Sequence, residues 1–179
     1  LISLEEDFNP EEFDIVLFGG GQDYEQTVVA KDLQNKKDTL IEYIEDDGVV
    51  VAICGGFQLL GRYYVNASGE RLNGISAIDV CTNGQFPNRL IGDVEIFNEE
   101  FGETYLGYEN HIGRTYLGKN MKPLGKVVKG YGNNEEDHAE GCHYKNVFCS
   151  YFHGPILVRN QHLTDRIIQT AAQRRLEKN

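Results

Sequence analysis

The sequence lacks an apolar run of the roughly 20 residues that a membrane-spanning helix needs. We expect no signal peptide, because the first residues are acidic rather than basic and apolar. Positive charge is scarce: 17 Lys and Arg against 28 Asp and Glu give a formal net charge of −11. Such an acidic chain is not expected to bind nucleic acid or an anionic membrane. No pair of its cysteines has C-x-x-C spacing, so we expect reduced thiols in a cytoplasmic protein rather than a disulfide framework.

Common metal and nucleotide motifs are absent too. His138, Cys142, His143 and Cys149 lie close in sequence, but their spacing matches no standard zinc site, and we predict no metal. The glycine loop at 19–23 has no third glycine at the spacing of a dinucleotide fingerprint, and no G-K-[ST] follows it as in a P-loop. We therefore expect no cofactor in this chain.

The first third of the chain alternates between strands and helices. Apolar runs predict strands over residues 13–18 and 49–53, with a helix over 24–46 between them and a short helix reaching about Tyr64. This order predicts an α/β fold with an open, mostly parallel, flavodoxin-like sheet flanked by helices.

The rest of the chain is richer in strands. Residues 75–152 predict added β-hairpins, and residues 164–178 predict a last helix with Thr164 as its N-cap. We expect residues 1–179 to form a single domain. Because the sequence has no initiator Met and opens in the middle of a pattern, we also expect that N-terminal residues are missing.

A buried strand that leads directly into a cysteine is the most informative feature of this chain. Residues 49–53 are apolar, and Cys54 is followed by two glycines and a segment of helical character. Ala52 and Gly56 are small, as a sharp strand-to-helix turn requires on both sides of its central residue. A thiol at a helix start is also favoured as a thiolate. The segment predicts a nucleophile elbow, and the alternative is a structural cysteine in the core.

A cysteine nucleophile needs a base within hydrogen-bond reach, normally histidine. The sequence offers five candidates: His111, His138, His143, His153 and His162. His153 follows a strand of buried character and precedes Gly154 and Pro155, so it is expected at the carboxyl end of a sheet strand, as Cys54 is. We predict His153 as the base and keep His111 as the second candidate.

Four motifs together carry a family resemblance: FGGGQD at 18–23, CGGFQLLG at 54–61, GYENHIGRT at 107–115 and FHGP at 152–155. In this order they resemble the class I, or triad-type, glutamine amidotransferases, and the last two resemble the subgroup that contains cobyric acid synthase. Within it, the likeness is greatest to the glutaminase subunits of lipid II isoglutaminyl synthases. The resemblance covers about residue 13 to the C-terminus. Members usually begin with a further strand and helix, which are apparently lacking here.

The resemblance implies a mechanism in which the thiol of Cys54 attacks the side-chain amide of L-glutamine and His153 moves the protons. It further implies an oxyanion hole made by the backbone N–H groups of Gly20 and Gly55. Gln58 matches a position that contacts glutamine.

Four more residues are assigned through the same resemblance. Arg89 resembles an arginine near the glutamine entry, and its alternative role is that of an exposed hairpin arginine. Glu109, Asn110 and His111 are expected to order the site from behind. This chain departs from the family pattern at one position. Many members have a Glu two residues after the catalytic histidine, where this chain has Pro155. We expect either a Cys–His dyad or a carboxylate from another residue or from the partner subunit.

The resemblance implies a heterodimer as well. Since no ATP motif is recognisable, the ammonia acceptor must be activated elsewhere, by a Mur-ligase-like synthetase subunit that uses ATP and Mg. The implied acceptor is the D-glutamate of the lipid II stem peptide, which becomes D-isoglutamine. Alternatives are a glutaminase for cobyrinate amidation, a flavodoxin-like thiol peptidase or redox protein, and a non-catalytic regulatory subunit.

Overall fold

The computed structural model describes residues 2–21 and 23–178. A four-stranded sheet lies at the centre, in the order β1 (Ile15–Phe18), β2 (Val49–Ile53), β12 (Val147–Ser150) and β11 (Cys142–Tyr144). Strands β1, β2 and β12 run parallel, and β11 is antiparallel to β12. The predicted parallel sheet is confirmed, and β2 has the bounds expected from its apolar run.

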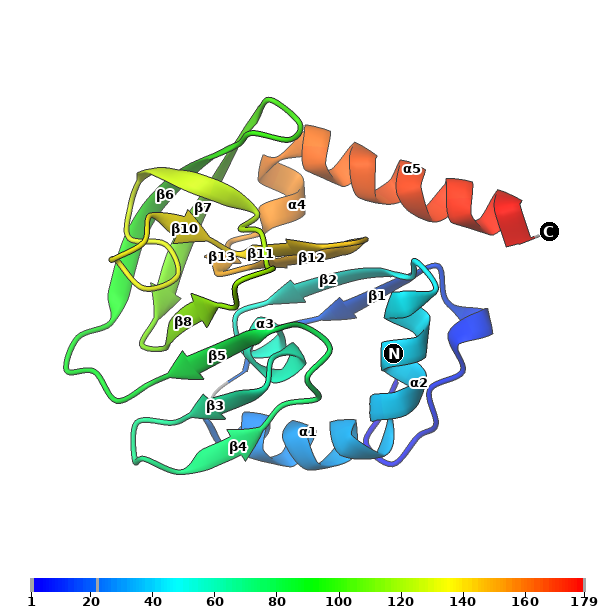
Figure 1. The fold of residues 1–179 in the computed structure, drawn as a ribbon, viewed down its shortest axis with the longest axis horizontal. Coiled ribbons are helices and arrows are strands. Elements are labelled where there is room, and N and C mark those ends of the chain that lie inside the picture. The colour runs from blue at the N-terminus through cyan, green and yellow to red at the C-terminus, as the bar shows by residue number, and fades with distance from the viewer. Residues whose placement is uncertain (1, 22, 179) are drawn as a thin grey trace.

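Helices cover both faces of this sheet (Figure 1). Their bounds are η1 (Pro10–Glu12), α1 (Asp23–Asn35), α2 (Lys37–Glu45), α3 (Gly55–Leu60), α4 (Ile156–Arg159) and α5 (Gln161–Lys178). Val50 and Ala52 of β2 belong to a core cluster with residues of α1, α2 and α3. Val49 and Val51 belong to a second cluster with the apolar face of α5. Alternate residues of one strand therefore stabilise two opposite layers.

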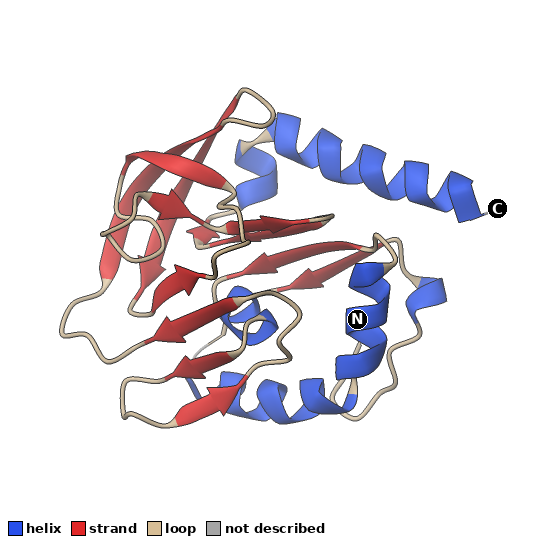
Figure 2. Cartoon of the chain, in the orientation of Figure 1, coloured by secondary structure: helices blue, strands red, loops and turns tan. Residues whose placement is uncertain are grey.

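Two further sheets form the added β structure, which gathers on the left of the molecule in Figure 2. One is antiparallel, in the order β10 (Ala139–Glu140), β9 (Gly125–Lys129), β6 (Leu90–Asn98), β7 (Glu103–His111) and β13 (Phe152–His153). The other has the order β4 (Arg71–Asn73), β3 (Tyr63–Val65), β5 (Val80–Asn83) and β8 (Arg114–Leu117). Because β13 directly follows β12 of the central sheet, it joins the hairpins to the α/β layer.

Three predicted helix bounds were wrong. The predicted helix over 24–46 is divided at Lys36 into α1 and α2. The helix after the elbow ends at Leu60 instead of near Tyr64, because Gly61 is extended and the aromatic residues that follow pair as β3. The last helix begins three residues earlier than expected, at Gln161. Thr164 is not its N-cap, because its hydroxyl lies inside the helix and donates to the carbonyl of Leu157 at 2.5 Å.

Candidate active site

Cys54 occupies a sharp turn between β2 and α3. Its backbone has φ +52° and ψ −106°, a strained conformation for a residue with a side chain. The Cys54 N–H donates to the carbonyl of Ser150 at 2.9 Å, which ties the turn to the end of β12. A Cβ on Gly56 would lie 2.5 Å from Cβ of Phe18, so this position has no room for a larger residue. The strand–turn–helix geometry is that of a nucleophile elbow.

The glycine loop, the elbow and β13 meet around the thiol. A Cβ placed on Gly20 would lie 3.4 Å from Cβ of Cys54 and 3.7 Å from Cε1 of His153. The Gly56 N–H donates to the carbonyl of Gly19 at 3.2 Å, which holds the loop against α3. The structure therefore brings Gly20, Cys54 and His153 together from three distant parts of the sequence. Their catalytic roles stay predictions.

Burial keeps both of the central groups neutral at rest. Desolvation raises the pKa of the Cys54 thiol, and the Gly55 N–H and the charge of Arg89 oppose this only in part. Desolvation lowers the pKa of His153, and the nearby His111 and Arg89 lower it further. The expectation of a thiolate stabilised by the helix start is thus not met in the resting chain, since α3 is short and desolvation is the larger effect. A neutral imidazole can accept the thiol proton.

A cavity of about 610 Å³ opens beside the thiol, within the usual size range for small-ligand sites. Its lining includes four of the predicted site residues, Cys54, Gln58, Arg89 and His111. His153 is not part of the lining. Arg89 and Glu25 bring charges of opposite sign to the cavity.

Arg89 is held by Asn110. The Arg89 Nε donates to Oδ1 of Asn110 at 2.9 Å, and Nη2 donates to the Asn110 carbonyl at 3.2 Å. Asn110 therefore orients the guanidinium from behind, which is the kind of supporting role expected for it. The exposed Arg89 keeps further N–H donors for a ligand, because a guanidinium carries five.

Glu109 and His111 form a fully buried pair on β7. The Glu109 carboxylate accepts hydrogen bonds from the N–H of Tyr131 at 2.7 Å and of Gly132 at 3.0 Å, and it lies 3.5 Å from Nε2 of His111. The His111 Nδ1 donates to the Gly113 carbonyl at 2.7 Å, because a carbonyl can only accept. His111 is thus held in place on a wall of the cavity, while His153 lies beside the elbow.

Gln58 is buried with its amide in a hydrogen-bonded chain. Its Oε1 accepts from Nε2 of Gln26 at 2.6 Å, and its Nε2 donates to the Tyr151 hydroxyl at 3.1 Å. The Tyr151 hydroxyl also shares a hydrogen bond of 2.5 Å with Oγ1 of Thr115, and its ring stacks on His111 with centroids 3.7 Å apart. Sequence reasoning missed Gln26 and Tyr151; the only signal was the place of Gln26 in the helix after the glycine loop.

Glu140 is a further residue that no sequence motif indicated. It is completely buried, and desolvation raises its pKa to about 8. The carboxyl group accepts from the Tyr151 N–H at 2.6 Å and from Oγ of Ser150 at 3.1 Å. It therefore supports the turn between β12 and β13, which contacts Cys54 on one side and leads to His153 on the other.

His153 has no carboxylate partner within the described part of the chain. Pro155, at the position where the family resemblance led us to expect Glu, precedes α4. Among residues 2–21 and 23–178, the histidines paired with a carboxylate are His111 and His143, and His153 is not one of them. The same residues contain no group of three or more His, Cys, Asp or Glu placed to hold a metal ion.

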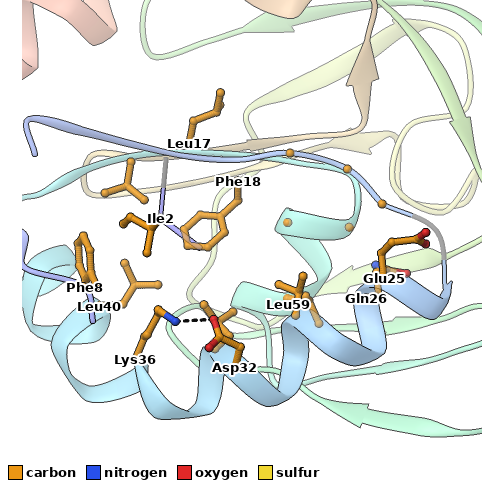
Figure 3. A pocket seen from close by; sticks show the side chains of 18 of the residues that line it. Ile2, Phe8, Leu17, Phe18, Glu25, Gln26, Asp32, Lys36, Leu40 and Leu59 are labelled. Carbon is orange, nitrogen blue, oxygen red and sulfur yellow. Dashed lines mark hydrogen bonds and ion pairs between the residues drawn. The ribbon is translucent and has the colours of Figure 1, made fainter. Parts of the chain in front are cut away.

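A second cavity, of about 560 Å³, lies on the other side of the glycine loop (Figure 3). Its walls are mostly apolar and include Ile2, Phe8, Phe18 and Leu40, with an ion pair of Lys36 and Asp32 at one end. It shares Gly20 and Gly55 with the region of the thiol, but Cys54 and His153 are not among its lining residues. The first cavity therefore holds the thiol, whereas the predicted oxyanion-hole residues Gly20 and Gly55 line the second.

Solved structures with the same fold include one described as a glutamine amidotransferase. The chain matches a structure described as a glutamine amidotransferase with a TM-score of 0.65 and 18% identity, over 90% of this chain and 81% of the other. It matches PurLQS from Thermotoga maritima with a TM-score of 0.58 and 18% identity, over 98% and 83%. At this identity the likeness establishes the fold alone, and it confirms the class I glutamine amidotransferase fold.

Sequence relatives are much closer. The chain is 57% identical over 175 residues to a lipid II isoglutaminyl synthase (glutamine-hydrolyzing) subunit GatD of Streptococcus pneumoniae, covering 98% of this chain and 67% of the relative. It is 45% identical to the subunit of the same name from Staphylococcus aureus, covering 92% and 66%. A probable cobyric acid synthase of Methanothermobacter thermautotrophicus is 36% identical, covering 59% and 23%. The chain thus spans about two thirds of the length of the two GatD subunits.

The family comparison agrees with these relatives. Residues 1–161 match the model of the CobB/CobQ-like glutamine amidotransferase domain. The resemblance carried by the four sequence motifs is therefore confirmed, and the chain belongs to the CobB/CobQ-like glutamine amidotransferase family.

Proposed function

We propose that this chain is the glutaminase subunit of a lipid II isoglutaminyl synthase and works as one glutamine amidotransferase domain. One observation carries the proposal: 57% identity, over 98% of the chain, to a Streptococcus pneumoniae subunit of that name. The second GatD relative supports it at 45%. The rivals with a peptidase, redox or purely regulatory role are disfavoured, because they do not account for this likeness.

In the proposed reaction, His153 accepts the proton of the Cys54 thiol while sulfur attacks the side-chain amide carbon of L-glutamine. The resulting tetrahedral oxyanion collapses, the C–N bond breaks, and protonated His153 returns the proton to the leaving ammonia. Water, deprotonated by His153, then attacks the thioester carbon and releases glutamate and the thiol. The position of Gly20, where a Cβ would lie close to both side chains, supports this pairing, and the lowered pKa of His153 supports its role as a base.

The backbone N–H groups of Gly55 and Gly20 are the proposed donors to the oxyanion. Gly55 already directs its N–H to the Cys54 sulfur, and a Cβ on Gly20 would lie 3.4 Å from Cβ of Cys54. Loss of one such donor raises the barrier by roughly 2.7–4 kcal/mol in comparable enzymes.

Glutamine is a zwitterion, and the cavity offers a matching arrangement. Arg89 is the proposed partner of the α-carboxylate, since Asn110 fixes its guanidinium and leaves donors free. Gln58 is the proposed contact of the substrate body, with its amide orientation set by Gln26 and Tyr151. The reacting amide would then reach Cys54.

The ammonia is proposed to pass to a Mur-ligase-like partner subunit, which binds ATP and Mg and amidates the D-glutamate of the lipid II stem peptide. The word "subunit" in the names of both relatives supports a partner. Four free cysteines fit a reducing, cytoplasmic compartment. Within the described residues, no helix has the length and apolar character to cross a membrane.

Cobyrinate amidation is the second candidate, because cobyric acid synthases occur among the relatives. Their match is weaker and covers less of this chain, for example 36% identity over 59% of it. The same glutaminase chemistry would serve both acceptors.

The test is glutamate release from L-glutamine by the full-length protein, co-expressed with its ligase partner. We expect glutamate release by the wild type and its loss in Cys54→Ala and in His153→Ala. Cys81→Ser changes a half-buried thiol outside the site and should leave the release intact. Amidation of lipid II but not of a cobyrinate by the same complex would identify the acceptor. Release unchanged in Cys54→Ala would refute the mechanism.

A further inference from the structure

We propose that Arg114 is a positioning residue for the glutamine site: it ties the loop that carries Arg89 to the opposite strand and thereby places the Arg89 guanidinium at the cavity. The inference rests on the proposed function, because it concerns how glutamine is bound. Arg114 lies within GYENHIGRT, but the motif by itself gives it no role.

Arg114 has three hydrogen-bonded partners and is only 4% exposed. Its Nη1 donates to the carbonyl oxygens of Asn88 and Ile112, both at 2.7 Å. Its Nη2 donates to Oε2 of Glu135, also at 2.7 Å. The ring of Phe86 covers the guanidinium, with 4.5 Å from Cζ to the ring centroid. Burial of such a charge is tolerated because most of its donors are satisfied.

The two carbonyls belong to two segments that build one side of the cavity. Asn88 directly precedes Arg89, and Ile112 is itself a lining residue. The pairing of β6 with β7 ends at this point, so no ladder hydrogen bond holds the segments beyond it. One rigid guanidinium that donates to both carbonyls sets the distance between them. Asn110, which binds the Arg89 side chain, is the β7 residue paired with Ile91, next to the end of this ladder.

Lysine replaces this group incompletely. Its ammonium has three N–H donors but is a compact point charge, so it lacks the planar fork that serves Asn88, Ile112 and Glu135 together and the stacking on Phe86. In Arg114→Lys we therefore expect the hold on the Asn88 and Ile112 carbonyls to weaken and the loop from Asn83 to Arg89 to shift. The bond to Glu135 matters less, because that carboxylate is 47% exposed and surface ion pairs contribute little.

A misplaced Arg89 weakens the hold on the α-carboxylate, which takes no part in the reaction. Such an interaction contributes equally to the bound substrate and to the transition state, so its loss raises KM and leaves kcat unchanged. We expect Arg114→Lys to raise KM for glutamine about tenfold, with kcat within about threefold of wild type. A role limited to stability would lower Tm and the active fraction without moving KM.

The experiment measures glutamate release by the full-length protein with its ligase partner, in wild type, Arg114→Lys, Arg89→Ala, the double variant and Glu135→Gln. Because Arg114 acts through Arg89, the double variant should have the KM of Arg89→Ala alone, and Glu135→Gln should keep the wild-type KM. Additive effects in the double variant, or a fall in kcat at constant KM, would overturn the proposal. If Arg114→Lys does not fold, Phe86→Leu replaces it in the experiment. An unchanged KM in Phe86→Leu would also overturn the proposal.

The outcomes separate this proposal from the proposed function. Wild type without glutaminase activity would overturn the function, and the role of Arg114 with it. An active wild type with additive variants would overturn the role of Arg114 alone.

Discussion

Glu140 is a buried carboxyl whose proton should govern how stable the protein is at different pH values, and Glu140→Gln is the perturbation that tests this. Desolvation raises its pKa from 4.5 to about 8. The hydrogen bonds from the Tyr151 N–H and the Ser150 hydroxyl favour the charged form but offset only part of this effect. The native protein therefore binds this proton more tightly than the unfolded chain does.

The sign and size of the effect follow from this difference. The stabilising contribution is complete below about pH 4.5 and is lost as the pH rises through about 8. A change in pKa from 4.5 to about 8 corresponds to about 5 kcal/mol in total, at 1.36 kcal/mol for each tenfold change in the proton affinity. About 3–4 kcal/mol of it falls between pH 5 and pH 8. For a chain of 179 residues, a loss of about 3–4 kcal/mol of stability lowers Tm by roughly 10 °C.

The amide in Glu140→Gln can still accept from Tyr151 but does not ionise. When the pH is raised from 5 to 8, we expect the Tm of Glu140→Gln to rise by roughly 10 °C relative to that of the wild type. Circular dichroism melts at constant ionic strength measure this, with Glu99→Gln, at an exposed carboxylate paired with Lys126, as the control. A Tm difference between Glu140→Gln and wild type that is independent of pH would refute the reasoning.

Three further predictions concern the elbow and its neighbours. Gly56→Ala should lower the free energy of unfolding by about 1–3 kcal/mol, read from denaturant unfolding, because its Cβ would lie 2.5 Å from Cβ of Phe18; a neutral effect would contradict the packing. Gly20→Ala should leave Tm nearly unchanged, since the new Cβ would lie at ordinary distances of 3.4 Å from Cys54 and 3.7 Å from His153. It should lower kcat, because the added methyl group lies directly beside these two side chains; full activity would place the reaction elsewhere. The acidic limb of kcat/KM should lie below pH 6.5, because burial lowers the pKa of His153 and the base must be neutral; a limb above 6.5 would exclude His153.

Local pattern was enough for the central part of the fold. The apolar run at 49–53 becomes a strand with those bounds, and the small residues on both sides of Cys54 become the elbow. Burial on both faces of a parallel strand leaves little choice of residue, so the sequence there carries a strong signal. The order of the four motifs likewise sufficed to identify the family.

Helix bounds and strand pairing were less predictable, because they depend on contacts far away in sequence. Nothing near residues 61–65 distinguishes a longer helix from the strand that pairs with both β4 and β5. Local preference gave way to tertiary packing there. Thr164 has the chemistry of an N-cap, but it lies inside α5, and its hydroxyl donates to the carbonyls of Leu157 in α4 and of Asn160 just before α5.

The sequence by itself therefore determined the α/β class and the elbow at Cys54, because each leaves a short, periodic or motif-like pattern, and it predicted a late histidine as the partner of that thiol. Only the tertiary structure decided which groups support them. The bonds of Gln26 to Gln58 and of Glu140 to Tyr151 join different elements, and Arg114 reaches from β8 to the loop before Arg89. Side chains that act on distant backbone have no fixed spacing in the sequence, so only folding makes their partners visible.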